Sequence, residues 1–230
     1  MHIEQASWDT KFYGYQVGKI TIEDQFTESD LALLREKSKA YKVVYVFSSS
    51  PVSLLEPFIK DVKVMFEKHL SEPLIPESDL VEFNSAIHSY DQLEAIALKT
   101  GVFSRFKLDK NFNQGEYEKL YSEWIKKSVQ KIIADHIFIK LIENRIVGFI
   151  SMRYTGQNMA EIELVAVADE YRGKGLARKF INHCDAFTLQ SGRSTITVPT
   201  QEFNEPAMNL YLKTGFNIKN KTYTYHIWNL

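Results

Sequence analysis

The chain has 230 residues, of which 44% are hydrophobic and 25% charged, a composition typical of one large globular domain or two small ones. Its formal net charge of −1 provides no overall attraction to nucleic acid or an anionic membrane, so neither is expected as a partner. A single cysteine, Cys184, no apolar leader, and no apolar run of the ~18 residues that a membrane helix needs together predict a cytoplasmic protein without disulfides.

The first hundred residues predict strands interleaved with helices. Thr27 and Asp30 have the spacing of a helix N-cap, and Ser89 is placed to cap a second helix that ends at Gly101. Apolar alternation or β-branched runs predict strands over residues 15–22, 42–47 and 61–66. We therefore expect an N-terminal α/β subdomain over residues 1–101.

Residues 102–115 show no long periodic element and are expected to connect this subdomain to a core over residues 116–230. The core opens with an amphipathic helix, followed by two strands that meet in a tight turn at Glu143–Asn144. The later elements are predicted as a strand, a helix, a strand, a helix and two final strands, over residues 160–168, 174–190, 194–199, 204–214, 216–220 and 222–228. An antiparallel hairpin before one strand–helix crossover predicts a mixed, mostly antiparallel central sheet flanked by helices.

Two glycines, Gly173 and Gly175, lie between the strand over 160–168 and the following helix. The first amides of a helix have no partner within it, and the helix dipole favours negative charge there. Glycine also allows a close approach to the backbone. The surrounding basic residues are Arg172, Lys174, Arg178 and Lys179. The turn is therefore predicted to bind a phosphate-sized anion through amides from about Gly173 to Ala177.

Two common phosphate-binding motifs do not match this turn. The third glycine position of a dinucleotide-binding motif holds Arg178, and no Lys-Ser or Lys-Thr follows as in a P-loop. The pattern R-x-x-G-x-A, in Arg172, Gly175 and Ala177, resembles the pyrophosphate loop of the GNAT superfamily of N-acetyltransferases. The segment "TQEFNEPAMNLYLKTGF" (200–216) resembles the second signature of that superfamily.

The resemblance implies a GNAT acyl-CoA N-acyltransferase fold and acetyl-CoA as cosubstrate. It implies that the strand backbone at Val165, Ala166 and Val167 pairs with the pantetheine. The pyrophosphate-loop positions are Arg172, Gly173, Lys174, Gly175, Leu176 and Ala177. Asn204 resembles the asparagine that contacts the coenzyme, and it is also well placed to cap a helix. Tyr211 resembles the tyrosine that protonates the departing thiolate.

Four further segments, "SWDTKFYGYQVGKI" (7–20), "DVKVMFEK" (61–68), "SRF" (104–106) and "YSEWIKKS" (121–128), resemble nucleotide-sugar N-acetyltransferases of the dTDP-fucosamine acetyltransferase type. That resemblance implies transfer of acetyl to the amine of a dTDP-linked 4-amino-4,6-dideoxyhexose in polysaccharide biosynthesis, with Ser104, Arg105 and Phe106 near the acceptor. Two alternatives stay open, an acetyltransferase for a peptide or small-molecule amine and an acyl-CoA-binding module without turnover. A homodimer is also left open.

The general base is less defined by sequence. Glu161 stands eleven residues before Arg172, as a catalytic glutamate does in some members of the superfamily. The resemblance implies a reaction by direct attack through a tetrahedral intermediate. Alternation along the strand predicts that Glu161 and Glu163 share a face with Val165 and Val167. A solvated strand face or a water chain are the alternatives. The six histidines and Cys184 form no metal-binding pattern, so no metal is expected.

Overall fold

The computed structural model describes residues 1–23, 25–72 and 74–229. In these residues ten strands form one sheet in the order β1-β2-β3-β10-β4-β9-β8-β7-β6-β5. The strands are β1 (Glu4–Gln5), β2 (Val17–Thr21), β3 (Val43–Ser48), β4 (Ile59–His69), β5 (Leu80–Glu82), β6 (His136–Ile142), β7 (Arg145–Thr155), β8 (Met159–Val167), β9 (Thr195–Gln201) and β10 (Asn217–Trp228). Only the pairs β2–β3 and β8–β9 are parallel, which confirms the mixed, mostly antiparallel sheet predicted from sequence.

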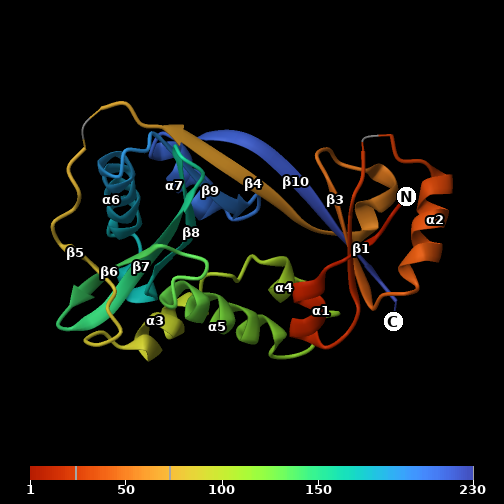
Figure 1. The fold of residues 1–230 in the computed structure, drawn as a ribbon, viewed down its shortest axis with the longest axis horizontal. Coiled ribbons are helices and arrows are strands. Elements are labelled where there is room, and N and C mark those ends of the chain that lie inside the picture. Colours follow the sequence, from red (N-terminus) through yellow and green to blue (C-terminus); the bar gives the residue numbers. More distant parts are fainter. Residues whose placement is uncertain (24, 73, 230) are drawn as a thin grey trace.

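Helices cover both faces of the sheet. They are α1 (Ser7–Tyr13), α2 (Glu28–Ser38), α3 (Tyr90–Ala97), α4 (Arg105–Leu108), α5 (Glu116–Val129), α6 (Leu176–Gln190) and α7 (Glu205–Lys213), with short 3-10 turns η1 (Ser53–Phe58) and η2 (Asp169–Tyr171). Figure 1 shows α3, α5, α4 and α1 in a row on one side of the molecule. None of the described helices is both long and apolar enough to cross a bilayer.

Separate apolar clusters hold the helices to the sheet. Phe180 and Cys184 of α6 are fully buried against strands β4 and β6–β9, while Leu93 of α3 and Ile125 of α5 pack on the opposite face of β6–β8. At the other end, Leu34 of α2 lies in a cluster with β3 and β10. Each cluster removes fully buried aliphatic side chains from water, worth about 1.5–3 kcal/mol each.

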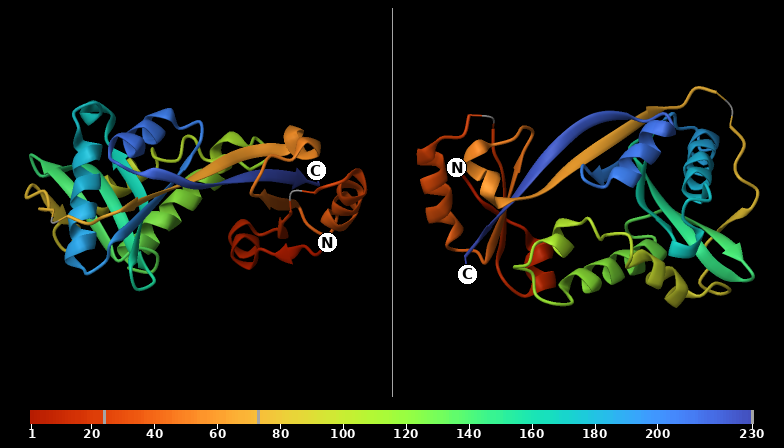
Figure 2. Two further views of the ribbon diagram at one scale, coloured as in Figure 1. Left: turned by 90° about the horizontal axis from the view of Figure 1, so that it is seen from above. Right: turned by 180° about the vertical axis from the view of Figure 1, so that it is seen from behind.

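Two long strands join the ends of the molecule. β4 and β10 pair from Asn217–Glu67 to Tyr225–Ile59, β10 then pairs with β3, and β4 pairs with β9. Figures 1 and 2 show this pair as an arch between the N-terminal elements and the rest. The sheet therefore passes without a break from one predicted subdomain into the other, and the division into residues 1–101, 102–115 and 116–230 stays a prediction.

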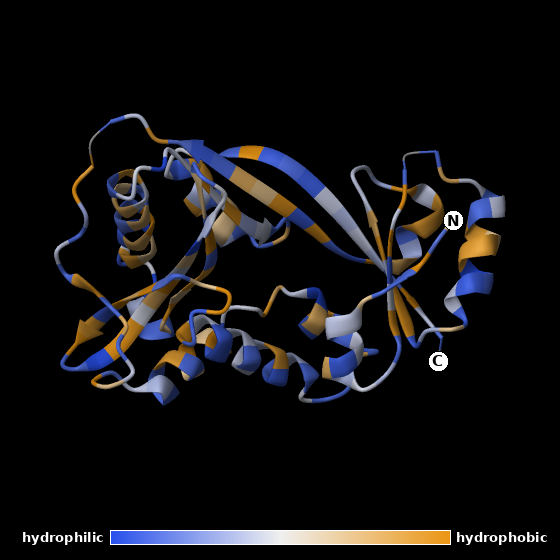
Figure 3. Ribbon diagram, viewed as in Figure 1, coloured by the Kyte–Doolittle hydropathy of each residue, from blue (hydrophilic) through white to orange (hydrophobic). Residues whose placement is uncertain are grey.

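The sequence prediction of two final strands is wrong, because residues 217–228 form the single strand β10. Its first half is polar and largely exposed, and Figure 3 shows this half of β10 as mostly hydrophilic. Polar residues are compatible with a strand that crosses between two cores without covering either. Their hydrophilic run resembles a loop only when the sequence is considered without its neighbours.

Local turn chemistry agrees with the sequence. The Thr27 side chain accepts a hydrogen bond from the Asp30 amide, and the Asp30 carboxylate accepts one from the Thr27 amide, which completes a capping box. The β6–β7 hairpin turns at Glu143 and Asn144, both with positive φ (48° and 60°), as a tight two-residue turn requires. The predicted positions of the helix N-cap and of the hairpin turn are thus confirmed.

Candidate active site

The site begins where two parallel strands separate. β8 pairs with β9 at three positions only, Met159 with Thr195, Ala160 with Ile196 and Glu161 with Thr197. Beyond Glu161, β8 continues paired to β7 alone, so its other edge no longer has a strand beside it. A cavity of about 580 Å³ lies beyond this point, between the end of β8, the start of α6 and helix α7.

Most residues that the sequence singled out meet in this cavity. Those on its wall are Val165, Ala166, Val167, Arg172, Gly173, Gly175, Leu176, Ala177, Asn204 and Tyr211. Lys174 is in the same turn but does not line the cavity, and its ammonium lies 5.0 Å from the centre of the Tyr171 ring. The structure therefore brings together three segments separated in the chain, and the role of each residue stays a prediction.

Sequence reasoning missed one wall of the cavity. It is formed by the end of α3 and the segment after it, with Ile96, Lys99, Thr100, Val102 and Phe103. Gly101 was interpreted only as a helix terminus, and nothing in the local pattern indicates a ligand. The wall is largely apolar, as expected for a surface that contacts the carbon chain of a ligand.

The start of α6 fits a phosphate-bearing ligand. Gly173 and Gly175 have φ of 74° and 79°, and a Cβ on either would meet no atom within 4 Å. Between Arg172, whose amide donates to Asp169, and Lys179, whose amide donates to Gly175, no described backbone amide has a backbone acceptor. Free amides at the positive end of a 15-residue helix are suited to binding a phosphate-sized anion.

Basic side chains are held at the mouth of the cavity by one acid. Asp169 forms ion pairs of 2.9 Å with both Lys99 and Arg172, and Arg172 Nε donates to the carbonyl of Val167 at 3.2 Å. All three charged side chains are more than half exposed, so these pairs contribute little to stability. Their effect is to orient two cations beside the free amides of the turn.

Asn204 caps α7, Tyr211 lies within this helix, and both line the cavity. The Asn204 side chain accepts a hydrogen bond from the Ala207 amide at 3.3 Å, which confirms the predicted cap. Tyr211 is 5% exposed and packs on Phe66 and Phe216. Burial raises the pKa of Tyr211 above its ordinary value, so the phenol keeps its proton at neutral pH.

Two glutamates and an arginine occupy the place where β8 leaves β9. Arg153 forms ion pairs with Glu161 at 2.9 Å and with Glu163 at 2.5 Å. Burial raises the pKa of Glu163 to about 7, an effect that the nearby Glu161 reinforces and Arg153 opposes. Glu161 also accepts a hydrogen bond from Thr197 at 3.4 Å.

The predicted common face of Glu161, Glu163, Val165 and Val167 is wrong. A register shift between the pairs of Ile162 and Leu164 leaves Glu163 without a partner on β7, as in a β-bulge. After the bulge the alternation is reversed, so Val165 and Val167 pack on the α6 side with Ala160 and Ile162. The two glutamates consequently lie on the opposite side, away from α6.

The residues proposed near the acceptor are not on this cavity. Ser104 is buried and caps α4 through a hydrogen bond from the Phe106 amide at 3.3 Å. Arg105 instead lines a second cavity beneath the arch of β4 and β10. Over residues 1–23, 25–72 and 74–229 no group of three or more His, Cys, Asp or Glu is arranged to hold a metal ion.

The structure thus combines a parallel strand pair that separates with a helix whose first amides are free. The profile of the acetyltransferase (GNAT) family matches residues 91–216, more than half of the chain. The chain belongs to the GNAT acetyltransferase family, and the fold predicted from its sequence is confirmed.

Relatives of known name match only in part. A streptothricin acetyltransferase of Escherichia coli is 36% identical over 77 residues, which is 34% of this chain and 44% of that protein. A dTDP-fucosamine acetyltransferase of Escherichia coli O6:H1 is 25% identical over 107 residues, 46% of this chain and 45% of that protein. The matched regions thus span about half the length of these relatives.

A solved GCN5-related N-acetyltransferase from Sphaerobacter thermophilus has a TM-score of 0.58 at 14% identity. The match covers 91% of this chain and 73% of that structure. It extends the shared fold to nearly the whole chain, including the N-terminal elements outside the family profile.

Two glycines with the same backbone strain test the anion site. Gly175→Ala forces an alanine to φ near 79° at the start of α6, and Gly192→Ala does the same at 78° just beyond its end. Each costs about 1–2 kcal/mol of stability. We expect Gly175→Ala to weaken acetyl-CoA binding at least tenfold by calorimetry while Gly192→Ala leaves it unchanged. Equal affinities in the two variants would mean that the turn does not hold the ligand.

Proposed function

We propose that the chain transfers the acetyl group of acetyl-CoA to an amine. The observation that carries the proposal is the meeting of three separate segments, from β8, the α6 turn and α7, on one cavity beside the parting of β8 and β9. A thioester bound there supplies an activated acyl carbonyl. An acyl-CoA-binding module without turnover is the alternative, and the protonated Tyr211 beside the cavity favours catalysis over it.

The donor is bound by groups of different kinds along the cavity. Free amides of Gly173 to Ala177 and the cations Arg172 and Arg178 suit the pyrophosphate. The apolar wall of Ile96, Val102 and Phe103 suits the pantetheine chain. The unpaired edge of β8 at Val165–Val167 provides amide and carbonyl groups that orient the chain and stabilise an oxyanion.

Two side chains are placed for proton transfer. Glu163 projects from the bulge on the side of the sheet away from α6, where it can accept a proton from the attacking amine directly or through one water. Tyr211 approaches from α7 and donates a proton to the departing thiolate, which is a good leaving group because a thiol pKa is about 8.5. We assign the base to Glu163 and treat Glu161, with its bonds to Arg153 and Thr197, as its support.

We further propose that the acceptor is a nucleotide-linked amino sugar of the dTDP-4-amino-4,6-dideoxyhexose type. Support comes from the N-terminal sequence resemblance and from the 25% identity to a dTDP-fucosamine acetyltransferase. The 36% identity to a streptothricin acetyltransferase favours a second candidate, a small cationic antibiotic-like amine. A cytoplasmic location and a homodimer belong to the same proposal.

A panel of amines separates these acceptors. We expect release of free thiol from acetyl-CoA with dTDP-linked or UDP-linked 4-amino sugars, at a rate at least tenfold above that with streptothricin, spermidine or a peptide amine. Thiol release is followed with a chromogenic disulfide reagent, and acetylated product by mass spectrometry. Faster turnover of streptothricin would favour a small cationic amine over the amino sugar as acceptor. Acetyl-CoA binding without any acetylated amine would favour an acyl-CoA-binding module without turnover.

Tyr211→Phe tests the acid. The substitution removes only the hydroxyl, so we expect kcat to fall about 100-fold, the lower end for acid–base catalysis, with little change in KM for acetyl-CoA. Tyr225→Phe is the matched control, because its buried hydroxyl accepts a hydrogen bond from the Val52 amide in the N-terminal cluster. It should cost about 1 kcal/mol of stability and leave kcat unchanged. An unaltered kcat for Tyr211→Phe would remove the acid role.

Glu163→Gln tests the base by pH. A base must be ionised, and the pKa of Glu163 is about 7, so the wild-type rate should increase as pH rises through 7. We expect Glu163→Gln to lose this increase and about 100-fold in kcat at pH 8. Glu161→Gln should keep it, with a pH midpoint shifted to lower pH because one negative neighbour is gone. Loss of the pH step in Glu161→Gln alone would assign the base to Glu161.

A further inference from the structure

A second cavity, of about 660 Å³, lies beneath the arch of β4 and β10, on the side of the sheet that faces α4. Its wall includes Phe47 of β3, Asp61 and Lys63 of β4, Arg105 of α4, and Thr222 and Thr224 of β10. These residues come from the N-terminal elements, the connecting segment and the last strand. The first cavity uses none of them.

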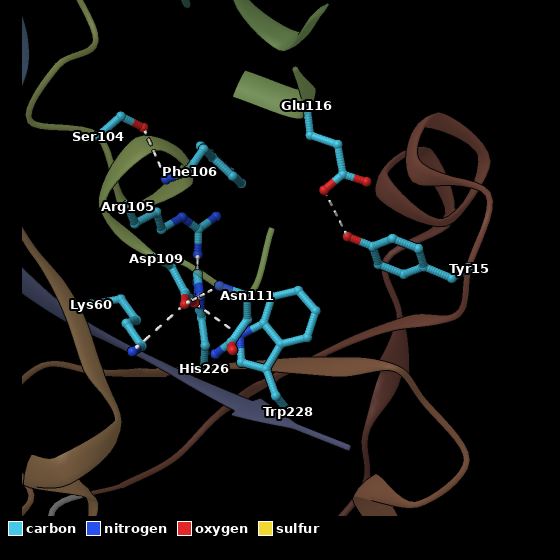
Figure 4. A network of polar contacts seen from close by, with 10 residues as sticks. All are labelled: Tyr15, Lys60, Ser104, Arg105, Phe106, Asp109, Asn111, Glu116, His226 and Trp228. Atoms are coloured by element: carbon cyan, nitrogen blue, oxygen red, sulfur yellow. Dashed lines mark hydrogen bonds and ion pairs between the residues drawn. The ribbon is translucent and has the colours of Figure 1, made fainter. Parts of the chain in front are cut away.

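Arg105 is fixed in this cavity by a chain of polar contacts. One of its guanidinium nitrogens lies 3.2 Å from Nε2 of His226, and the group stacks 4.4 Å over Tyr45 and 4.5 Å over Phe106. His226 is 1% exposed, and its Nδ1 lies 2.6 Å from a carboxylate oxygen of Asp109. Figure 4 shows Asp109, His226 and Arg105 in line.

The contacts between Asp109, His226 and Arg105 determine which ring nitrogen of His226 carries the hydrogen. A guanidinium only donates, so Nε2 of His226 must accept and Nδ1 must carry the hydrogen given to Asp109. Burial lowers the pKa of His226 to about 4, which keeps the ring neutral. Burial alone would raise the pKa of Asp109, but hydrogen bonds from His226 and Trp228 lower it to about 2. The result is a permanent cation held in one orientation.

Asp61 is a buried carboxylate on the same wall. It is 6% exposed, and its Oδ1 has no hydrogen-bond donor among the residues that the structure describes. Burial raises the pKa of Asp61 to about 6, and the charges of Arg105 and Lys63 on the same wall oppose this shift. An unsatisfied buried carboxylate is costly, which indicates that a ligand with hydroxyl or amine donors completes it.

Lys63, on the wall of the second cavity, lies near the end of β8. Lys63 pairs with Gln201 of β9, and β9 is the neighbour of β8, so Lys63 and the end of β8 are two strand spacings apart. At ~4.8 Å per spacing this is at least ~10 Å, and the divergence of β8 and β9 increases it. Lys63 is still close enough to lower the pKa of Glu163. An acceptor reaching both places must be extended.

We propose that this second cavity is the acceptor subsite for an anionic group, with Arg105 and Lys63 binding a phosphate and Asp61 accepting hydrogen bonds from neighbouring hydroxyl groups. Asp109 and His226 act as positioning residues for Arg105. The inference rests on the proposed acetyl transfer and selects among its acceptors. A compact amino acid has its amine and carboxylate on one carbon and cannot span the two cavities, and a purely cationic amine offers nothing to Arg105.

The test uses the whole chain and binding as well as turnover. By calorimetry we expect dTDP and inorganic pyrophosphate to bind the wild type. We expect Arg105→Met to lower the affinity for dTDP at least tenfold and Arg105→Lys to lower this affinity less. Arg145→Met, an exposed arginine at the distal hairpin, is the matched control and should change nothing. The affinity for acetyl-CoA should be the same in the wild type and the three variants. A loss of acetyl-CoA binding would therefore indicate a fault in the proposed donor site and not in the second cavity.

Kinetics then separate positioning from folding. With the amino sugar found in the acceptor panel, His226→Phe should raise KM for that acceptor at least tenfold, with KM for acetyl-CoA and kcat little changed. If His226→Phe does not fold, the Arg105 variants carry the test because Arg105 lies on the cavity wall. Glutarate binding in place of both dTDP and pyrophosphate, or equal affinities for dTDP in wild type and Arg105→Met, would overturn the phosphate subsite.

Discussion

The site depends on one feature of the sheet, the short pairing of β8 with β9. The two strands are paired at three positions, the last of which is Glu161 with Thr197. Beyond this pair, the edge of β8 that faces β9 has no strand partner. Unpaired strand edges are normally protected because they bind other chains. Here α6, α7 and the segment after α3 enclose the edge, so its amide and carbonyl groups face a cavity of limited size. The bulge at Glu163, in the pairing of β8 with β7, directs an acid to the side opposite α6 while the valines beyond it pack toward α6.

The residues that meet on the first cavity could be predicted because their signals are local. A positive φ at Gly173 and Gly175, a cap at Asn204 and a tyrosine seven residues later are all fixed within one or two turns of chain. The hairpin at Glu143–Asn144 is similarly local. Such features can be predicted from residue type and spacing alone, since the physical cause and the residue that responds to it are neighbours in sequence.

The parts that sequence could not supply depend on contacts between distant segments. The bulge that reverses the faces of β8 depends on register against β7, and no residue type near Glu163 specifies it. The sequence predicts two strands, 216–220 and 222–228, whereas the pairing of β10 with β4 continues through Lys221 between them. The chain Asp109–His226–Arg105 joins residues more than a hundred positions apart, and each alone is an ordinary charged or aromatic side chain.

The arch of β4 and β10 links the two cavities through one continuous sheet. β4 pairs with β9 at one end, and β10 pairs with β3 at the other. A displacement of the N-terminal elements relative to β9, which would also move Asp61 and Lys63, would therefore have to shear a continuous ladder of strands. Backbone ladders resist such shear, because slipping by one residue would turn every side chain to the other face. The spacing between the unpaired edge of β8 and Arg105 is therefore set by the sheet, while Arg105 itself is set by His226 on the same β10 strand. In the proposed subsite, the acceptor must span the distance between the edge of β8 and Arg105, which the backbone fixes. The length of the acceptor is therefore as important for selection as its charge.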